Sequence, residues 1–313
     1  MNNTGPLFIA GKSGRLAQAL IAEATEQNRH VVAMGRPDLD LVDRAAITRA
    51  LANVKPRAII NASGIVNMEQ AERDPDLAFA VNCDAAGNLA AAAEASAIPF
   101  VHLSSNYVFD GSKDTPYLEE DATTPISVYG KSKVAGESTV MVADPDAVIV
   151  RTSWLFGPSA GNFVTTTLRL AETNDTLRVV TDQHGRPTAL TDLSRALLHI
   201  TDHRLQGRGE AGIYHVAGRG ETTWFELAQA LFSGWTARGG RVPHVQAITS
   251  AQWGGPARPL YGVLDCTKAE RIFGVSLPAW QESLERCLDR IAQNRSALAG
   301  EARAQAPITR SRS

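Results

Sequence analysis

Short apolar runs and longer segments of helical period alternate along the first half of the chain. Strands that are buried on both faces are continuously apolar rather than alternating, and five runs fit that description. They are LFIAG (7–11), VVAM (31–34), AIINAS (58–63), FVHLSS (100–105) and AVIVRTSW (147–154). Strict alternation of strands and helices predicts right-handed crossovers, and therefore an α/β fold with a doubly wound parallel sheet.

The segment between the third and fourth expected strands has the clearest helical pattern. Its apolar residues recur every four positions, which places them along one side of a helix. They are Leu77, Val81, Ala85, Leu89 and Ala93. We expect this side to pack on the sheet, and Pro99 to stop the chain just before the next strand.

The pattern is looser after about Gly157, where loops rich in Gly, Pro and Arg separate the apolar segments. The runs LRVVTD, IYHVAG and VQAITS resemble strands, and the runs TTWFELAQALF and LPAWQESLERCLDRI resemble helices. We therefore expect a first domain of residues 1–157 and a smaller α/β lobe of mainly 158–299, with some strands or helices returning to the first domain. Residues 300–313 are polar and aperiodic, so we expect a flexible tail there.

Charge and composition narrow the classes of function. Of the 313 residues, 44% are hydrophobic and 20% charged, and the formal net charge is −2. This balance gives no reason to expect a nucleic acid or an anionic membrane as partner, and it leaves a small ligand open. The acidic run Glu119 to Asp121 most simply forms a solvated loop, although it could orient a partner subunit.

Cysteine usage and the first residues point to a cytoplasmic protein. Cys83, Cys266 and Cys287 are odd in number and far apart, which is typical of reduced thiols rather than of a disulfide framework. The chain does not open with a basic segment and a long apolar run, and no stretch reaches the ~18 apolar residues of a membrane span. His102 and His184 have no partner at metal-ligand spacing, so we assign no metal.

A turn with two glycines follows the first expected strand. In LFIAGKSGRLAQAL, Gly11 and Gly14 separate that strand from a helix, and Ala17 completes a G-x-x-G-x-x-A pattern. Such a turn lets backbone N–H groups at a helix N-terminus approach a pyrophosphate. Two glycines there can also serve tight packing alone, but their place at the start of a βαβ series favours dinucleotide binding.

The end of the second expected strand bears on the type of dinucleotide. Proteins that bind NAD commonly have a carboxylate there, which accepts from the adenosine 2′-hydroxyl, whereas this chain has Gly35 and Arg36. An arginine suits a 2′-phosphate, and Lys12 lies in the first turn, so the pattern favours NADP(H) and leaves NAD(H) open. The alternative is that Arg36 is a solvated loop charge. Asp40 and Leu41 are expected beside the adenine.

The segment SVYGKSKVAGES places Tyr129 four residues before Lys133, so both side chains lie on one face of a helix. A nearby ammonium lowers the pKa of a phenol, which would let Tyr129 exchange a proton with a substrate oxygen. Ser104 and Ser105 end the fourth expected strand, at the edge where open α/β sheets bind ligands. The Ser105 hydroxyl could position a carbonyl there. Each feature alone is common on protein surfaces, but their order after a glycine turn favours a catalytic site.

Gly11, Gly14, Ser105, Tyr129 and Lys133 together resemble the extended short-chain dehydrogenase/reductase superfamily. Within it, the runs YVFDG, VYGKSKVAGE and DQHGRPT resemble the dTDP-4-dehydrorhamnose reductase family, over roughly residues 7 to 295. The resemblance implies a Rossmann-like NAD(P)-binding domain with a C-terminal substrate lobe. It also implies reduction of the C4 ketone of dTDP-4-dehydrorhamnose to dTDP-L-rhamnose by NAD(P)H.

The resemblance further implies roles for single residues. Tyr129 would be the proton donor, Lys133 would also bond the nicotinamide ribose, and Ser105 would bond the carbonyl. The expected cofactor contacts are Gly11, Lys12, Ser13, Gly14, Arg15, Leu16, Arg36, Asp40, Leu41, Ala62, Ser63, Gly64, Tyr129 and Lys133. The expected substrate contacts are Met68, Ser105, Asn106, Tyr107 and Trp154. Trp154 is either a lid over the sugar or an ordinary half-buried aromatic. The small-molecule partner would be a nucleotide sugar. We also expect a homodimer.

The chain departs from the resembled family near the expected substrate site. The family commonly has aspartate where this chain has Asn106 and where it has Glu69, and it commonly has serine where this chain has Gly262. An amide keeps hydrogen bonding but loses the charge, which bears on substrate identity. A dehydratase would need an Asp–Glu pair directly after the hydroxyl residue. In this chain Asn106 and Tyr107 follow Ser105, so dehydration is not expected. A non-catalytic NADP-binding regulatory subunit, and a reductase or epimerase for another nucleotide sugar, stay open.

Overall fold

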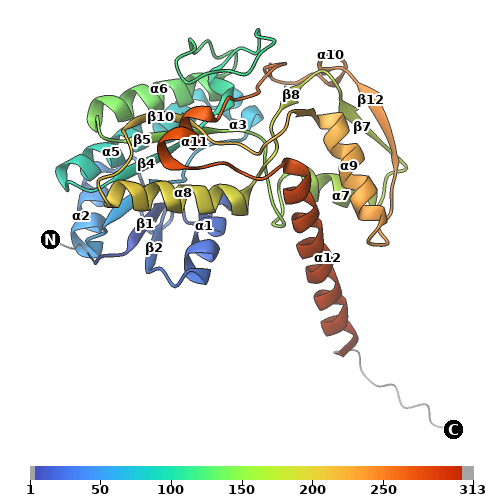
Figure 1. Ribbon diagram of the computed structural model, residues 1–313, viewed down its shortest axis with the longest axis horizontal. Helices are drawn as coiled ribbons and strands as arrows, with labels where there is room; N and C mark the ends of the chain where they lie inside the picture. The colour runs from blue at the N-terminus through green and yellow to red at the C-terminus, as the bar shows by residue number, and fades with distance from the viewer. Residues whose placement is uncertain (1–3, 305–313) are drawn as a thin grey trace.

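The computed structural model describes residues 4–304, and its centre is a six-stranded sheet in the order β10-β5-β4-β3-β1-β2 (Figure 1). The strands are β1 (Leu7–Ala10), β2 (Val31–Met34), β3 (Ala58–Asn61), β4 (Phe100–Ser105), β5 (Val148–Thr152) and β10 (Gly212–His215). Every pairing in this sheet is parallel. The predicted doubly wound fold and the five strands predicted for the first half are confirmed. The strand order reverses between β1 and β3, which makes that crevice the expected ligand site of such a sheet.

Helices cover both faces of the sheet, so its strands are buried on both sides (Figure 1). One face carries α1 (Arg15–Glu26), α8 (Leu190–Leu205) and α11 (Thr267–Phe273), and the other carries α2 (Arg44–Val54), α5 (Ala85–Ala95) and α6 (Val128–Ala143). Successive side chains of a strand point to opposite faces. Accordingly, Leu7 and Ile9 of β1 belong to the first core and Phe8 to the second. This double burial explains the continuously apolar runs.

A second, smaller lobe lies beside the carboxyl ends of the strands (Figure 1). Its parallel pair is β7 (Thr176–Val180) with β12 (His244–Ile248), and its helices are α7 (Phe163–Ala171), α9 (Trp224–Thr236), α10 (Ser250–Trp253) and α12 (Trp280–Ala304). Two-residue strands complete it: β6 (Leu155–Phe156) with β9 (Thr188–Ala189), and β8 (His184–Gly185) with β11 (Thr222–Thr223). The run IYHVAG is not part of this lobe, because β10 pairs with β5 in the main sheet.

The helical segment before β4 differs from its prediction. It comprises α4 (Pro75–Phe79), a π-helical turn η1 (Ala80–Asp84) and α5, after a separate short helix α3 (Met68–Arg73). A π turn holds more residues than an α turn, so a spacing of four does not stay on one side across it. Ala78 and Asn82 are buried, whereas Leu77 and Val81 are only partly buried. The predicted stripe is therefore wrong for its first two members and correct for Ala85, Leu89 and Ala93.

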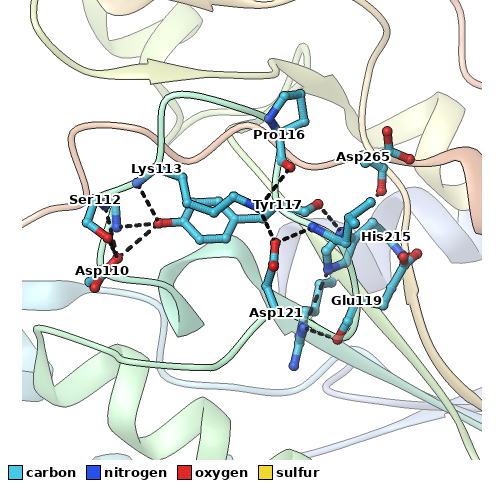
Figure 2. A network of polar contacts seen from close by, with 12 residues as sticks. Asp110, Ser112, Lys113, Pro116, Tyr117, Glu119, Asp121, His215 and Asp265 are labelled. Carbon is cyan, nitrogen blue, oxygen red and sulfur yellow. Dashed lines mark hydrogen bonds and ion pairs between the residues drawn. The ribbon is translucent and has the colours of Figure 1, made fainter.

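The loop that joins β4 to α6 starts with η2 (Asn106–Val108) and is held by polar contacts (Figure 2). The Tyr117 hydroxyl donates to the Asp110 carboxylate at 2.9 Å. The Glu119 carboxylate accepts the backbone N–H of His215, on β10, at 2.9 Å. Glu119 is buried, so the expectation of a solvated acidic loop is wrong for this residue, which ties the loop to the edge of the sheet.

A buried ion pair joins α6 to the sheet. The Arg151 guanidinium, on β5, donates from Nε at 2.9 Å and from Nη2 at 2.7 Å to the two carboxylate oxygens of Glu137, on α6. These side chains are only 2% and 5% exposed. The Ser104 hydroxyl, on β4, donates to the same carboxylate. A buried charge requires such partners, so the pair fixes the helix relative to two strands.

The C-terminal helix α12 begins as the sequence predicts and extends away from the body of the protein (Figure 1). The tail predicted for 300–313 overlaps its last residues and otherwise lies outside the described part of the chain, so it stays a prediction. In the part of the chain that the structure describes, the helices lack either the length or the apolar character needed to cross a membrane.

Replacement Arg151→Met should destabilise the fold strongly, because it leaves the Glu137 carboxylate buried without its cation. Loss of one partner of a buried pair costs about 3–5 kcal/mol of unfolding free energy. The control is Arg36→Met, which removes the exposed pair between Arg36 and Asp40 (3.0 Å) and should cost less than about 1 kcal/mol. Urea unfolding of both variants measures the difference, and equal small losses would contradict the structural role of the buried pair.

Candidate active site

A cavity of about 700 Å³ lies between the carboxyl ends of the strands and the second lobe. Its volume is in the range of sites for small molecules and cofactors. The first domain contributes the turn after β1, the residues after β3, the end of β4 and the start of α6. The second lobe contributes residues of α7, β7 and α9. The cavity therefore includes the switch point between β1 and β3.

The turn after β1 has the shape that a dinucleotide pyrophosphate needs. Gly11 has a φ of +98°, and a Cβ atom there would lie 2.8 Å from the Cα atom of Ser63, so only glycine lets the β1 and β3 loops approach so closely. Gly14 is the N-cap of α1, and within residues 4–304 no side chain caps that helix. Its first N–H groups can therefore bind an anion. Of the expected cofactor contacts, the cavity is lined by Gly14, Arg15, Leu16, Ala62, Ser63, Gly64, Tyr129 and Lys133.

The other expected cofactor contacts lie outside the cavity lining. They are Gly11, Lys12, Ser13, Arg36, Asp40 and Leu41. Both cations are paired at the surface, Lys12 with Asp38 and Arg36 with Asp40. The backbone N–H of Val42 lowers the pKa of Asp40, and Arg36 lowers it further. Leu41 belongs to the apolar core and is 8% exposed, so little of its side chain is open to the expected adenine.

Tyr129 and Lys133 lie on the face of α6 that lines the cavity. The helix begins after Ser127, whose hydroxyl accepts the N–H of Gly130 at 3.1 Å and so caps the first turn. The Lys133 ammonium donates to the carbonyl of Leu103, on β4, at 2.6 Å. This bond holds the lysine against the strand that ends in Ser105.

Burial dominates the protonation of both groups. It raises the pKa of Tyr129 to about 12, although a hydrogen bond with the Ser105 side chain lowers it in part. It lowers the pKa of Lys133 to about 8, against the effect of the Glu137 carboxylate. The predicted lowering of the phenol pKa by the ammonium is therefore wrong, because both groups are removed from water and the ammonium binds a carbonyl. The result is a neutral phenol.

The end of β4 brings the predicted substrate contacts to the same place. The Ser105 hydroxyl accepts the N–H of Tyr107 at 3.2 Å, and it donates to the Oδ1 atom of Asn106 at 3.4 Å. The ring of Tyr107 meets the ring of Tyr129 edge to face, with centroids 5.6 Å apart. Ser105, Asn106, Tyr107, Tyr129 and Lys133 all line the cavity. The three predicted catalytic side chains are thus together.

The two remaining predicted substrate contacts also line the cavity. Met68 is the first residue of α3 and is 7% exposed. Trp154 follows β5 and has a φ of +47°, a conformation that is rare for a bulky residue. Its ring stacks on Trp224, with centroids 3.6 Å apart and 8° between the planes. Of the two interpretations of Trp154, this stacking favours a fixed wall over a movable lid.

The sequence pattern did not predict the wall that the second lobe provides. That wall includes Phe163, Thr167, Leu170, Leu177, Arg178, Val179, Trp224 and Trp253. Two polar contacts also cross between the lobes: Arg258 pairs with Glu69 at 3.2 Å, and Arg15 donates to the carbonyl of Gly161. The spacing of residues within one helix or strand predicts which of its sides is buried. It does not predict which distant helix or strand packs against that side.

The buried side chain of Asn82 links two segments that line the site. Its side chain accepts the N–H of Ile65 at 2.8 Å and donates to the Ile65 carbonyl at 2.9 Å. It also donates to the Ser132 hydroxyl, on α6, at 2.9 Å. The loop after β3 is thereby fixed to the helix that carries Tyr129. Among residues 4–304, no three His, Cys, Asp or Glu side chains are grouped so as to hold a metal ion.

Comparison with known proteins agrees with this arrangement. The family model "RmlD substrate binding domain" matches residues 5–293. The chain is 42% identical over 283 residues to a dTDP-4-dehydrorhamnose reductase of Sinorhizobium fredii, covering 90% of this chain and 95% of the relative. It is 37% identical over 284 residues to the reductase of that name from Aggregatibacter actinomycetemcomitans, covering 89% and 97%.

Solved structures give the same picture. A dTDP-4-dehydrorhamnose reductase of Clostridium acetobutylicum superposes with a TM-score of 0.85 at 33% identity, over 91% of this chain and 99% of the other. That of Bacillus anthracis, in complex with NADP, has a TM-score of 0.85 at 31% identity, with the same coverage. The resemblance predicted from the sequence is confirmed, and the chain belongs to the dTDP-4-dehydrorhamnose reductase family.

Proposed function

We propose that the protein reduces the C4 ketone of dTDP-4-dehydrorhamnose to dTDP-L-rhamnose, with NADPH as the reductant. The observation that carries this proposal is the convergence of Ser105, Tyr129 and Lys133 on one cavity beside a dinucleotide turn. Relatives that cover nearly the whole chain are named for this reaction, which supports the choice of substrate. NADP in the Bacillus anthracis reductase supports the choice of cofactor, and NAD(H) is the alternative.

The first domain fits NADPH at the turn after β1. Gly11 to Leu16 and Ala62 to Gly64 would hold the pyrophosphate and the nicotinamide half, because close backbone approach and open N–H groups occur there. Lys12 and Arg36 would attract the 2′-phosphate. When bound, NADPH supplies the hydride to the ketone carbon. We also propose that residues 158–299 mainly hold the nucleotide sugar, with Met68, Asn106, Tyr107 and Trp154 against the sugar.

Tyr129 supplies the proton that the ketone oxygen needs. The reaction turns that oxygen into an alkoxide, which is a stronger base than a phenolate, so a phenol with a pKa of about 12 still gives up its proton favourably. On substrate binding, the Ser105 hydroxyl would turn from the Oδ1 atom of Asn106 to the same oxygen, donate to it and orient the ketone. The Lys133 ammonium, one helical turn from Tyr129, would donate to the nicotinamide ribose and so hold the cofactor beside the phenol.

The decisive experiment is an assay of NADPH oxidation with dTDP-4-dehydrorhamnose, with the product identified by mass spectrometry. Formation of a dTDP-6-deoxyhexose with one equivalent of NADP⁺ is the expected result. A tightly bound dinucleotide that is never oxidised or reduced would favour the regulatory subunit instead. If the protein reduces a different nucleotide sugar and not dTDP-4-dehydrorhamnose, the substrate assignment is wrong.

Other expectations about the protein stay predictions. We expect a homodimer, which analytical ultracentrifugation would test, and we expect neither a nucleic acid nor a membrane as partner. A cytoplasmic location is expected because the three well-separated cysteines are typical of reduced thiols.

Replacement Tyr129→Phe should lower kcat by about 10²-fold or more, because it removes the proton donor, while NADPH affinity changes little. The matched control is Tyr214→Phe. The pKa of Tyr214 is likewise raised by burial to about 12 and its hydroxyl is also bonded, to the Glu210 carbonyl at 2.8 Å, but it does not line the cavity. Steady-state rates and a cofactor titration test both variants. Full activity in Tyr129→Phe would refute its role.

The pH profile should follow Lys133. Its pKa of about 8 means that the ammonium predominates below pH 8 and is lost above it, whereas Tyr129 stays protonated up to about pH 12. We expect kcat/KM for NADPH, which reports the free enzyme, to fall by about tenfold per pH unit above roughly pH 8. Lys133→Arg keeps the charge and should remove this decline. A wild-type profile that is flat to pH 10 would contradict the assignment.

Replacement Arg36→Asp should lower kcat/KM for NADPH by about tenfold or more, the scale of one lost charge-assisted hydrogen bond. The value for NADH should change little, because NADH has no 2′-phosphate. The control is Arg44→Asp, which makes the same charge change at an exposed position of α2. An unchanged preference between NADPH and NADH in Arg36→Asp would remove the argument for the phosphate.

A further inference from the structure

Two of the positions at which the sequence departs from the resembled family touch each other. Asn106 starts η2 at the end of β4, and Gly262 lies 156 positions later. The Nδ2 atom of Asn106 donates to the carbonyl oxygen of Gly262 at 3.0 Å. Asn106 is 2% exposed and lines the cavity beside Ser105. Both positions therefore belong to one contact at the reacting end of the site.

We propose that Asn106 and Gly262 form a coupled unit that fixes the Asn106 amide and thereby selects a neutral, hydroxyl-bearing sugar beside the reacting ketone. Gly262 would be a specificity-determining residue although it has no side chain. The inference rests on the proposed function and adds a reason for substrate choice that the catalytic side chains do not supply.

The missing side chain of Gly262 makes room for the amide. A Cβ atom at this position would lie 2.4 Å from the Nδ2 atom of Asn106, which is closer than real Cβ atoms approach. The Gly262 segment is held by β8, since the N–H of Gly262 donates to the His184 carbonyl at 2.8 Å and the N–H of His184 donates to the Leu260 carbonyl at 2.7 Å. Any side chain at 262 would therefore displace the Asn106 amide rather than its own backbone.

The carbonyl of Gly262 also decides the orientation of the amide. A carbonyl oxygen accepts and does not donate, so the NH₂ group of Asn106 must face it. The Oδ1 atom of Asn106 then faces the Ser105 hydroxyl, at 3.4 Å. Asn106 is thus a positioning residue for Ser105, whose side chain in turn bonds Tyr129.

The fixed amide leaves one donor and one acceptor for a ligand. An asparagine side chain has two N–H donors and two acceptor lone pairs. The bond to Gly262 uses one donor, and the Oδ1 atom is open to a ligand when the Ser105 hydroxyl turns to the ketone. A sugar hydroxyl can both accept and donate, so it matches the remaining pair. The amide has no charge, so it offers no particular stabilisation to a sugar with an ammonium group at that place.

A double-mutant cycle tests the coupling. Gly262→Ala should lower kcat/KM for the sugar nucleotide by about tenfold, because the new methyl group displaces the amide, and Asn106→Ala should have an effect of similar size. The double variant should be no worse than Asn106→Ala, since the smaller side chain leaves room for the methyl group. If the two losses multiply in the double variant, the positions are independent and the proposal is overturned.

Substrate selection is tested with Asn106→Asp. This variant should lower the ratio of kcat/KM for dTDP-4-dehydrorhamnose to that for an analogue with an amino group beside the ketone by about tenfold or more, because the carboxylate attracts the ammonium. A merely structural role would lower both values equally and leave the ratio unchanged. An unchanged ratio would overturn the assignment of selectivity to this residue.

The coupling of Asn106 and Gly262 can be tested separately from the proposed function. If the wild-type protein does not reduce dTDP-4-dehydrorhamnose, the function is rejected, and the pair is tested by unfolding the three variants of the cycle in urea. The double variant should then have the midpoint of Asn106→Ala, whereas additive shifts would reject the coupling.

Discussion

The bidentate ion pair between Glu137 and Arg151 is the constraint on which the site depends. Tyr129, Lys133 and Glu137 follow one another at intervals of four along α6, so they share one face of the helix. Because the Glu137 carboxylate is tied to Arg151 on β5 and to Ser104 on β4, that face is held against the ends of these strands. The same strand end carries Ser105. The geometry of the proposed proton-donating site is thus set by charged groups that do not line the cavity.

Removal from water acts in opposite directions on the pKa values of Tyr129 and Lys133, and both groups are still mostly protonated at neutral pH. The phenol stays neutral and available as a donor, while an ammonium with a pKa of about 8 is still mostly charged at neutral pH. The Glu137 carboxylate contributes here too, since it opposes the effect of burial on Lys133. In water, the same Tyr–Lys spacing would leave both pKa values near 10, so the two groups would titrate in the same pH range.

Much of this could be predicted from the chain because it depends on local spacing. The apolar strand runs, the Gly11 turn and the distance of four residues between Tyr129 and Lys133 are periodic or short-range features. The π turn at Ala80–Asp84 could not be predicted, because it depends on how the helix packs on its neighbours. The stacking of Trp154 on Trp224 and the contact of Asn106 with Gly262 join residues far apart in sequence. The sign of the Tyr129 pKa shift follows from exclusion of water, which spacing alone does not report.

Strand β10 has a consequence for the biosynthesis of the protein. It is an outer strand of the main sheet, pairs with β5, and comes from residues 212–215, after most of the second lobe's cavity wall has been formed from earlier residues. The sheet therefore remains one strand short until about two thirds of the 313 residues have left the ribosome. The edge of β5 is open in the nascent chain during that time, so the sheet of the first domain cannot be completed before part of the second lobe has been synthesised.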